Sequence, residues 1–253
     1  MPLLFLSPSL QPFNEYVGGG NEKQYMNLIA DAMEPLLIAN GISFDRSDEN
    51  GSLRDAIIAS NSNDYHLHLA LHSNASPPAL SGVLSGTDVY YRTGSYEGQV
   101  AAEIIADNFK NIYPNPSKVR AVSTTSLAEL NMTKAPAVLM EIAYHDNPAD
   151  SQWIKDNIDK IAMNLVQSLT YYFDIPFIPQ VIPPYEAYVD TMGGNLNIRS
   201  KPSMEAPVIT TAPDGSILLV VGKWENWYVV HYNGYIGYAN GNYVNTNLPS
   251  AQQ

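Results

Sequence analysis

The stretch Asp64-Tyr65-His66-Leu67-His68-Leu69-Ala70-Leu71-His72-Ser73-Asn74-Ala75 decides how the first part of this chain folds. Its apolar run predicts a buried strand over residues 66–71. Because side chains alternate along a strand, His66, His68 and His72 share one face. His72 comes at the carboxyl end, where open α/β sheets collect ligands, so we expect it to belong to a site. The alternative is a hydrogen-bonded histidine of the core or sheet edge, which position favours for His66 and His68.

Short apolar runs alternate with helical patterns on both sides of this strand, which indicates an α/β domain. Apolar residues at helical spacing predict helices that include residues 26–37, 100–112 and 154–169. The other predicted strands cover residues 3–6, 42–46, 87–91, 119–122 and 137–142. The first domain is therefore expected to be a sheet flanked by helices.

The composition changes at IPFIPQVIPPY, residues 175–185, where four of eleven residues are proline. Such a segment is typical of a semi-rigid, extended linker. The short strands that follow, joined by turn signals such as Asn233-Gly234, predict a small all-β barrel with a type I′ hairpin turn. We therefore expect an α/β domain over residues 1–176, a linker over 177–186, a barrel over 187–247 and a polar tail over 248–253.

Composition and charge exclude several classes of protein. The 253 residues carry 13 Lys and Arg against 25 Asp and Glu, a net charge of −12, so the basic footprint of nucleic-acid or anionic-membrane binding is missing. No apolar run approaches the about 20 residues of a membrane span, and MPLLFLSPSL lacks the features of a signal peptide. We therefore expect no nucleic-acid partner, no membrane insertion and no encoded classical secretion.

The absence of cysteine restricts the chemistry that a site can use. With no Cys there are no disulfides, no thiolate metal ligands and no cysteine nucleophile. Any metal must be held by His, Asp, Glu or another oxygen donor.

Two carboxylates complete the candidate groups. Glu141 ends the apolar run of residues 134–142, and a carboxylate buried there needs a cation, a metal or a hydrogen-bond network, unless the strand end simply emerges into solvent. Glu22 follows three glycines at the start of a predicted helix, where the helix dipole alone also explains a glutamate. Together, His72, Glu141 and Glu22 are the groups that a metal-assisted hydrolase needs.

At these residues the chain resembles the zinc-dependent N-acetylmuramoyl-L-alanine amidases of the Amidase_3 type. The resemblance rests on LSPSLQPFN (6–14), NEKQYMNLIADAM (21–33), HLALHSNA (68–75) and TKAPAVLMEIAYHDNPADSQWI (133–154). Residues 193–244 resemble a bacterial SH3-like module, through LNIRSKPS, WENWYVV and NGYIGY. The two resemblances imply a mixed open sheet flanked by helices, followed by a small SH3-like barrel that binds the cell wall.

The resemblance also implies roles for particular residues. Carried over position by position, Glu22 and His72 are zinc ligands and Glu141 is the general base that takes the proton of the attacking water. Asn74, next to His72, is expected to contact substrate. In the family a further histidine, just after the first strand, completes the zinc site, but the position is occupied here by Phe13, which cannot bind a metal.

Three nearby residues are candidates to replace that missing ligand. Asn14 or Glu15 supplies an oxygen, or His145 supplies an imidazole, unless the site works with a weaker metal. His68 is a poor candidate unless the strand bends, because it lies roughly 13 Å from His72 along the strand. His145 lies in the segment His145-Asp146-Asn147-Pro148, for which a loop cap is the favoured interpretation and support of the site the alternative. Sequence reasoning does not choose among the three.

The implied function is that of a peptidoglycan hydrolase that cleaves the amide between N-acetylmuramic acid and L-alanine. Its partner is then the cell-wall glycopeptide and its location extracellular or the cell wall, reached as a phage endolysin or as an autolysin with its leader removed. Two alternatives stay open. Phe13 favours a wall-binding protein with a degenerate amidase site, and the fold also permits a metal-dependent peptidase acting on other amides.

Overall fold

A computed structural model describes residues 1–246, and the predicted polar tail lies outside them. Contacts divide the chain into two units. The first unit comprises Leu3–Glu34 and Phe44–Tyr172, and the second comprises Met1–Pro2, Pro35–Ser43 and, among the described residues, 173–246.

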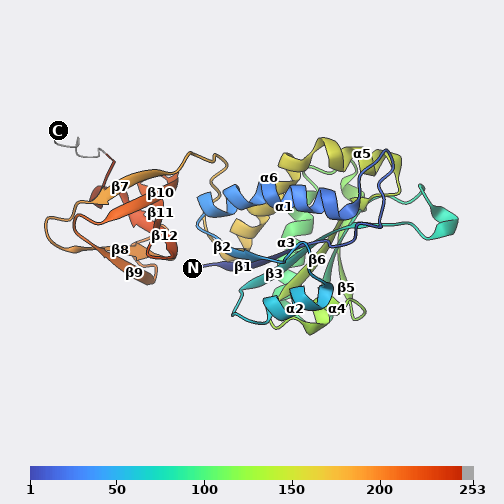
Figure 1. The fold of residues 1–253 in the computed structure, drawn as a ribbon, viewed down its shortest axis with the longest axis horizontal. Coiled ribbons are helices and arrows are strands. Elements are labelled where there is room, and N and C mark those ends of the chain that lie inside the picture. Colours follow the sequence, from blue (N-terminus) through green and yellow to red (C-terminus); the bar gives the residue numbers. More distant parts are fainter. Residues whose placement is uncertain (247–253) are drawn as a thin grey trace. The chain divides into compact units, whose positions relative to one another are not determined.

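The first unit contains a mixed six-stranded sheet in the order β2-β1-β3-β6-β4-β5 (Figure 1). Neighbours β1, β3 and β6 are parallel, whereas β4 runs antiparallel to β6 and parallel to β5. The strands are β1 Leu3–Pro8, β2 Ser43–Arg46, β3 Leu67–Asn74, β4 Thr87–Arg92, β5 Val119–Thr124 and β6 Ala137–Tyr144. The expected mixed open sheet is confirmed, and each predicted strand corresponds to one of these six.

Helices cover both faces of this sheet, and the central strands β1, β3 and β6 are buried along most of their length, as expected for strands covered on both faces. In Figure 1, α2 and α4 lie on one face, and the remaining helices lie on the other. The helices are α1 Glu22–Ala39, α2 Leu53–Ser60, α3 Tyr96–Phe109, α4 Ala128–Met132, α5 Pro148–Asp156 and α6 Ile158–Phe173, with short 3₁₀ turns η1 Pro78–Leu80 and η2 Pro116–Lys118.

The helices differ from the sequence expectation in two respects. The single helix expected over 154–169 is two helices, because α5 ends in a cap at Asn157 and α6 begins at the next residue. Helices α2 and α4 had no predicted counterpart. A capping box between Ser52 and Asp55 fixes the start of α2.

The second unit is an antiparallel β-structure in the order β13-β7-β10-β11-β12-β8-β9, as expected for an SH3-like barrel. Its strands are β7 Tyr185–Val189, β8 Asn195–Arg199, β9 Val208–Pro213, β10 Ile217–Trp224, β11 Trp227–Tyr232, β12 Tyr235–Asn240 and β13 Val244–Asn245. The hairpin turn has φ of 48° at Asn233 and 81° at Gly234, the two positive values of a type I′ turn. Strand β7 begins at Tyr185, within the segment expected to be linker.

Most buried side chains of the first unit are apolar, but a few polar ones interrupt its core. Ser7, His68, Asp88 and Glu129 are buried on strands or on α4, and Glu22 is buried at the start of α1. Buried polar groups need partners, so these residues lead to the candidate site. Within residues 1–246, no helix has the length and apolarity to cross a membrane.

Candidate active site

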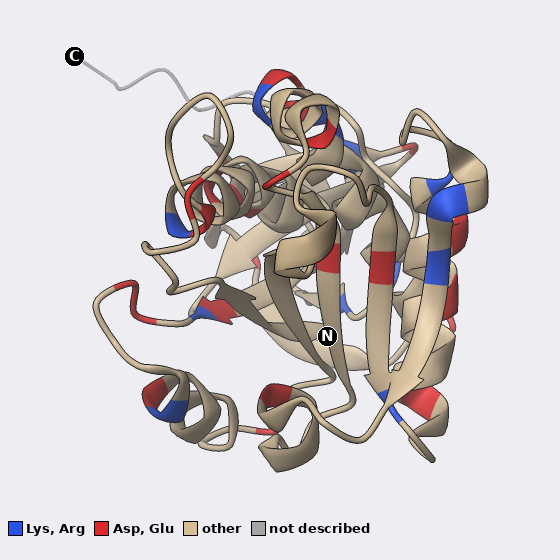
Figure 2. Ribbon diagram, turned by 90° about the vertical axis from the view of Figure 1, so that its right-hand side faces the viewer, with Lys and Arg blue, Asp and Glu red and all other residues tan. Residues whose placement is uncertain are grey.

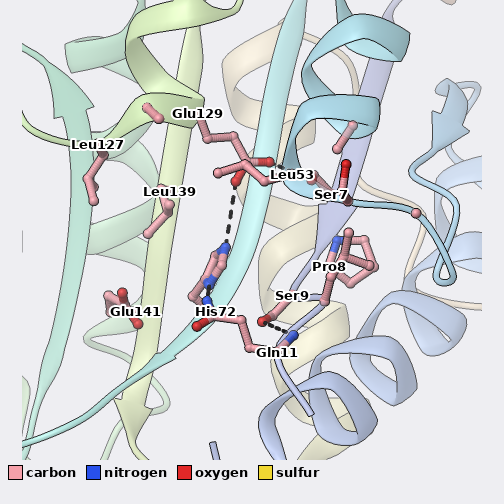
Figure 3. Close-up of a pocket in the computed structure, with 15 residues that line it drawn as sticks. Ser7, Pro8, Ser9, Gln11, Leu53, His72, Leu127, Glu129, Leu139 and Glu141 are labelled. Atoms are coloured by element: carbon pink, nitrogen blue, oxygen red, sulfur yellow. Dashed lines mark hydrogen bonds and ion pairs between the residues drawn. The ribbon is translucent and has the colours of Figure 1, made fainter. Parts of the chain in front are cut away.

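A cavity of about 450 Å³ opens beside the carboxyl ends of β1, β3 and β6, on the face covered by α2 and α4 (Figure 3). Its walls include His72 from β3, Glu141 from β6, Glu129 from α4 and Gln11 from the loop after β1. His72 and Glu141 are partners in the sheet register, so their side chains emerge together on this face. The position matches the expectation that ligands collect at the carboxyl ends of parallel strands.

His72 and Glu22 form the centre of the site. Nδ1 of His72 lies 2.9 Å from Oε1 of Glu22, whose side chain is almost fully buried. Burial favours the neutral form of Glu22, but the hydrogen bond and the charge of His72 prevail and hold the pKa of Glu22 below its usual range. Burial likewise opposes the charged form of His72, yet the carboxylates of Glu129 and Glu22, which accept from its ring nitrogens, raise the pKa of His72 to about 10.

Two amide side chains from the loop after β1 join this pair. Nδ2 of Asn14 donates to Oε2 of Glu22 at 2.5 Å and to Oε1 of Gln11 at 3.1 Å. Nε2 of Gln11 lies 3.3 Å from Nδ1 of His72. Among the three candidate substitutes, Asn14 is the one with a side-chain hydrogen bond to Glu22, and Gln11 links it to His72, whereas Phe13 is 74% exposed.

The fold holds the other predicted residues by different contacts. Glu15 is exposed and forms a backbone bridge with Asn21. His145 is buried, with Nδ1 3.2 Å from both Oγ and the carbonyl oxygen of Ser73, and its ring stacks on Tyr16. Hydrogen bonds thus occupy His145 away from the Glu22–His72 pair.

Asn74, the expected substrate contact, ends β3. Its carbonyl oxygen accepts a hydrogen bond from the His145 amide at 2.9 Å, and its side-chain oxygen accepts one from the amide of Ala75 at 2.9 Å. These contacts turn the chain at the end of the strand. Its expected contact with substrate stays a prediction.

Glu129 is a site residue that sequence reasoning missed. It is 4% exposed and accepts a hydrogen bond from Oγ of Ser7 at 2.5 Å. Its Oε1 lies 3.0 Å from Nε2 of His68, and its Oε2 lies 3.6 Å from Nε2 of His72. His68 in turn contacts Oγ of Ser60, at 2.9 Å. One buried carboxylate thus links the two histidines that the strand pattern placed on one face.

These contacts hold Glu129 in its charged form. Burial opposes ionisation, but the hydrogen bonds and charges of His68 and His72 hold the pKa of Glu129 far below its usual range. Glu129 lies on the Nε2 side of the His72 ring, and Glu22 lies on its Nδ1 side. Such a carboxylate fixes the orientation of a histidine ring that binds a metal.

Glu141 is the carboxyl group of the site that has the fewest partners. Its Oε2 is buried and has no hydrogen-bond partner. Burial raises the pKa of Glu141 to about 7, with the charge of His72 opposing the shift and the charges of Glu22 and Asp88 adding to it. A carboxyl group that titrates near neutrality and lines a cavity has the properties of a general base or acid.

The side chains of this site allow a test of whether a metal ion fits. Among residues 1–246, no three His, Asp or Glu side chains form a ligand cluster. Glu22 and His72 offer one oxygen and one nitrogen, and Asn14 offers a second oxygen when its amide turns by 180°. A set of one imidazole, one carboxylate and one amide oxygen, with an open cavity beside it, fits a borderline divalent cation such as zinc.

The fold of this chain is similar to that of several solved amidase structures. The chain resembles the N-acetylmuramoyl-L-alanine amidase from Clostridium difficile 630, with 21% identity, a TM-score of 0.60 and coverage of 68% of this chain and 97% of that one. It resembles the catalytic domain of the amidase CwlV from Bacillus (Paenibacillus) polymyxa var. colistinus, with 18% identity, a TM-score of 0.59 and coverage of 69% and 99%. It also resembles the catalytic domain of the CD27L endolysin targeting Clostridia difficile, with 23% identity, a TM-score of 0.56 and coverage of 68% and 97%. The fold is thus that of the amidases.

The family follows from comparison with family models. The model described as N-acetylmuramoyl-L-alanine amidase matches residues 14–171, and the model described as bacterial SH3 domain matches residues 194–245. The chain therefore belongs to the N-acetylmuramoyl-L-alanine amidase family and carries a bacterial SH3 domain. No curated protein matched the sequence. The amidase match begins at Asn14, so Phe13 lies just outside the matched residues.

Proposed function

We propose that this chain hydrolyses the amide between N-acetylmuramic acid and L-alanine in peptidoglycan, with Glu141 as general base and a divalent cation, zinc by preference, held by Glu22, His72 and Asn14. The observation that carries the proposal is the unpartnered, buried oxygen of Glu141 beside the Glu22–His72 pair, in a chain of the amidase family. Glu141 and His72 both line one cavity, which gives the substrate carbonyl a place next to the base.

In the proposed hydrolysis, each residue of the site has a distinct role. When bound, the cation supplies a Lewis acid that polarises the carbonyl and makes water more acidic. Glu141 takes the proton of the attacking water and delivers it to the nitrogen of the departing L-alanine. Glu129 holds the His72 ring through Nε2, so that Nδ1 keeps its direction through the reaction. No covalent intermediate with the protein is required.

Product analysis tests the reaction itself. Digestion of purified cell walls is expected to release peptides with a free amino-terminal L-alanine and glycan strands with a free lactyl carboxyl group. Mass spectrometry of the products distinguishes this cleavage from all others. New amino termini at any other residue would instead support a metal-dependent peptidase acting on other amides.

Metal content tests the proposed ligands. After equilibration with micromolar zinc, we expect about one zinc per chain by elemental analysis, as in single catalytic zinc sites. His72→Ala is expected to lose it, and Asn14→Ala to weaken it by at least 10-fold, because each removes a donor to the cation. His231→Ala, which removes an exposed histidine of β11, is the matched control and should keep the metal.

The opposite outcome has a definite meaning. Without stoichiometric zinc in the unaltered chain, the site is degenerate, and the chain is better described as a wall-binding protein. Zinc that survives Asn14→Ala unchanged would keep the metal but remove Asn14 from the ligands.

We further propose that the SH3 domain binds the cell wall and that the protein acts there, outside the cytoplasm. The support is the family match over residues 194–245 and the wall substrate of the amidase family. A chain ending at Pro184 is expected to sediment with purified walls less completely than the full chain. Equal sedimentation of the two chains would remove the binding role from the second unit.

A further inference from the structure

Four charged or ionisable residues form a row across the sheet of the first unit. The register pairs His72 of β3 with Glu141 of β6, Glu141 with Asp88 of β4, and Asp88 with Arg120 of β5. Residues paired in register project from the same face. Figure 2 shows the outer part of this arrangement, with acidic positions on two neighbouring strands and a basic one on the next strand at the same level. The row thus leads outward from the candidate catalytic base to a cation.

Arg120 is held in place by the residue between it and the base. Its Nε lies 2.5 Å from Oδ1 of Asp88 and its Nη2 lies 3.4 Å from Oδ2. The Asp88 side chain is 7% exposed, whereas that of Arg120 is 70% exposed. Asp88 therefore accepts hydrogen bonds from the edge of the guanidinium formed by Nε and Nη2. Nη1 and the outer edge do not take part in that contact, so they can donate to a second anion.

A second cation and a hollow accompany Arg120. A cavity of about 380 Å³ is lined by Asp88, Arg120, Lys118 and Tyr144, among others. The ammonium group of Lys118, two residues before Arg120, donates to Oγ of Ser85 at 2.5 Å, which fixes it at the edge of this cavity. A chain of net charge −12 thus places two cations around one hollow next to its candidate site. An anionic group is the ligand that such a hollow attracts.

The spacing of the row sets the distance between this hollow and the reacting bond. Neighbouring strands lie about 4.8 Å apart, so the backbone of Arg120, two strands from Glu141, is roughly 10 Å away. Two residues of extended peptide span at most about 7 Å, and the arginine side chain covers the remainder. The hollow is therefore within reach of the residue that follows L-alanine in the substrate peptide.

We propose that Arg120 and Lys118 form a carboxylate-binding subsite for the peptide that leaves from the scissile amide. The inference rests on the proposed function and adds a specificity to it. The second residue of peptidoglycan peptides is a glutamate linked through its side chain, so its α-carboxyl group is either free or amidated. A subsite of two cations favours peptides in which this carboxylate is free over those that carry the carboxamide.

Binding of two matched peptides to the full chain tests the subsite without requiring catalysis. The probes are L-Ala-γ-D-Glu-L-Lys with a free α-carboxyl group and the same tripeptide with the α-carboxamide, followed by calorimetric titration. A charge-assisted hydrogen bond is worth about 10-fold or more in affinity, so we expect the carboxylate peptide to bind at least 10-fold more tightly. Arg120→Gln and, separately, Lys118→Gln are expected to reduce this preference.

The controls separate charge at the subsite from charge elsewhere and from misfolding. Arg92→Gln makes the same change at the far end of β4, which pairs with Thr124 of β5, and should leave the preference intact. If Arg120→Gln disturbs folding, Lys118→Gln still tests the subsite. Lys118 is exposed, and its ammonium group donates to the hydroxyl group of Ser85, so its loss should affect folding little. Equal affinity of the unaltered chain for the two peptides would overturn the proposal, as would a preference that survives both substitutions.

A parallel assay with the corresponding N-acetylmuramoyl tripeptides separates this proposal from the proposed function. If the unaltered chain cleaves both substrates with equal kcat/KM, the subsite is refuted and the amidase function stands. If it cleaves neither, yet prefers the carboxylate peptide in titration and loses that preference in Arg120→Gln, the amidase function is refuted and the subsite stands.

Discussion

Glu141→Gln is expected to lower kcat by about 10² to 10⁴-fold, the usual contribution of a general base, while the chain stays folded. Glutamine has the same shape as glutamate but accepts no proton from water. The measurement is release of amino-terminal L-alanine from purified walls, with zinc content followed in the same samples. Retention of zinc would assign the loss to proton transfer and not to the metal site.

The same substitution has a stability consequence whose sign follows from the pKa. In the metal-free chain, burial raises the pKa of Glu141 from its usual 4.5 to about 7. A carboxyl group whose pKa is raised on folding contributes its full share to the free energy of unfolding below pH 4.5. This contribution is lost as the pH rises through 7 and the group becomes charged. Above pH 7 the charged Glu141 thus destabilises the metal-free protein, and Glu141→Gln removes that cost.

Thermal unfolding in the presence of a chelator measures this difference. Between pH 5 and pH 8, the melting temperature of Glu141→Gln is expected to gain on that of the unaltered chain. If the melting temperatures of the two proteins changed with pH in parallel, Glu141 would be solvated and its pKa not raised.

The kinetic prediction has its own contrary outcome. If Glu141→Gln lowered kcat by less than 10-fold, Glu141 would be excluded as the general base.

Glu129→Ala is expected to destabilise the first unit by about 3 to 5 kcal/mol, the usual effect of removing one partner from a buried ion pair. The substitution leaves the hydroxyl group of Ser7 and Nε2 of His68 without their carboxylate acceptor. Helices α1 to α6 all lie before Asp174, so ellipticity at 222 nm reports mainly on the helix-containing part of the chain. Denaturant titration followed at this wavelength gives the change.

Two matched variants define what the effect means. Glu103→Ala removes an exposed glutamate from α3 and is expected to change stability by less than about 0.5 kcal/mol. Glu129→Gln keeps the shape of the side chain but not its charge, so its loss of stability should lie between those of Glu103→Ala and Glu129→Ala. Because the pKa of Glu129 is lowered in the fold, its contribution is present above pH 4.5 and is lost as pH falls, so the gap between Glu129→Ala and the unaltered chain should narrow in acid. A gap that is the same at pH 4 and pH 7 would contradict this assignment.

The sequence was sufficient for the strands and for the position of the candidate base. The apolar run that leads to Glu141 forms strand β6, and the run that leads to His72 forms strand β3, which continues for two residues beyond His72 to Asn74. The resemblance to the amidases then supplied the expectation of a mixed open sheet, but not the order of its strands. These features depend on short segments, which a single sequence displays directly.

The elements that complete the cavity were not predictable in the same way. Helix α4 has five residues, too few to show a helical period, and the contact of Glu129 with His68 joins residues 61 positions apart. Asn14 could be named as a candidate ligand from its place in the chain, but its choice over Glu15 and His145 depends on which side chains the loop after β1 turns toward Glu22. Such choices arise from tertiary packing, which leaves no periodic pattern.

The register of β4 has a consequence for attempts to redesign this protein. The row from His72 to Arg120 is aligned by backbone pairing, so its spacing does not depend on the loop that connects β3 to β4. That loop is open to lengthening or exchange with loops from other hydrolases. A slip of one position in β4 would instead turn Asp88 to the opposite face and leave Arg120 without its anchor. A grafted loop should therefore be judged by whether it preserves the pairing register of β4, because that register keeps Asp88 and Arg120 on the same face as Glu141.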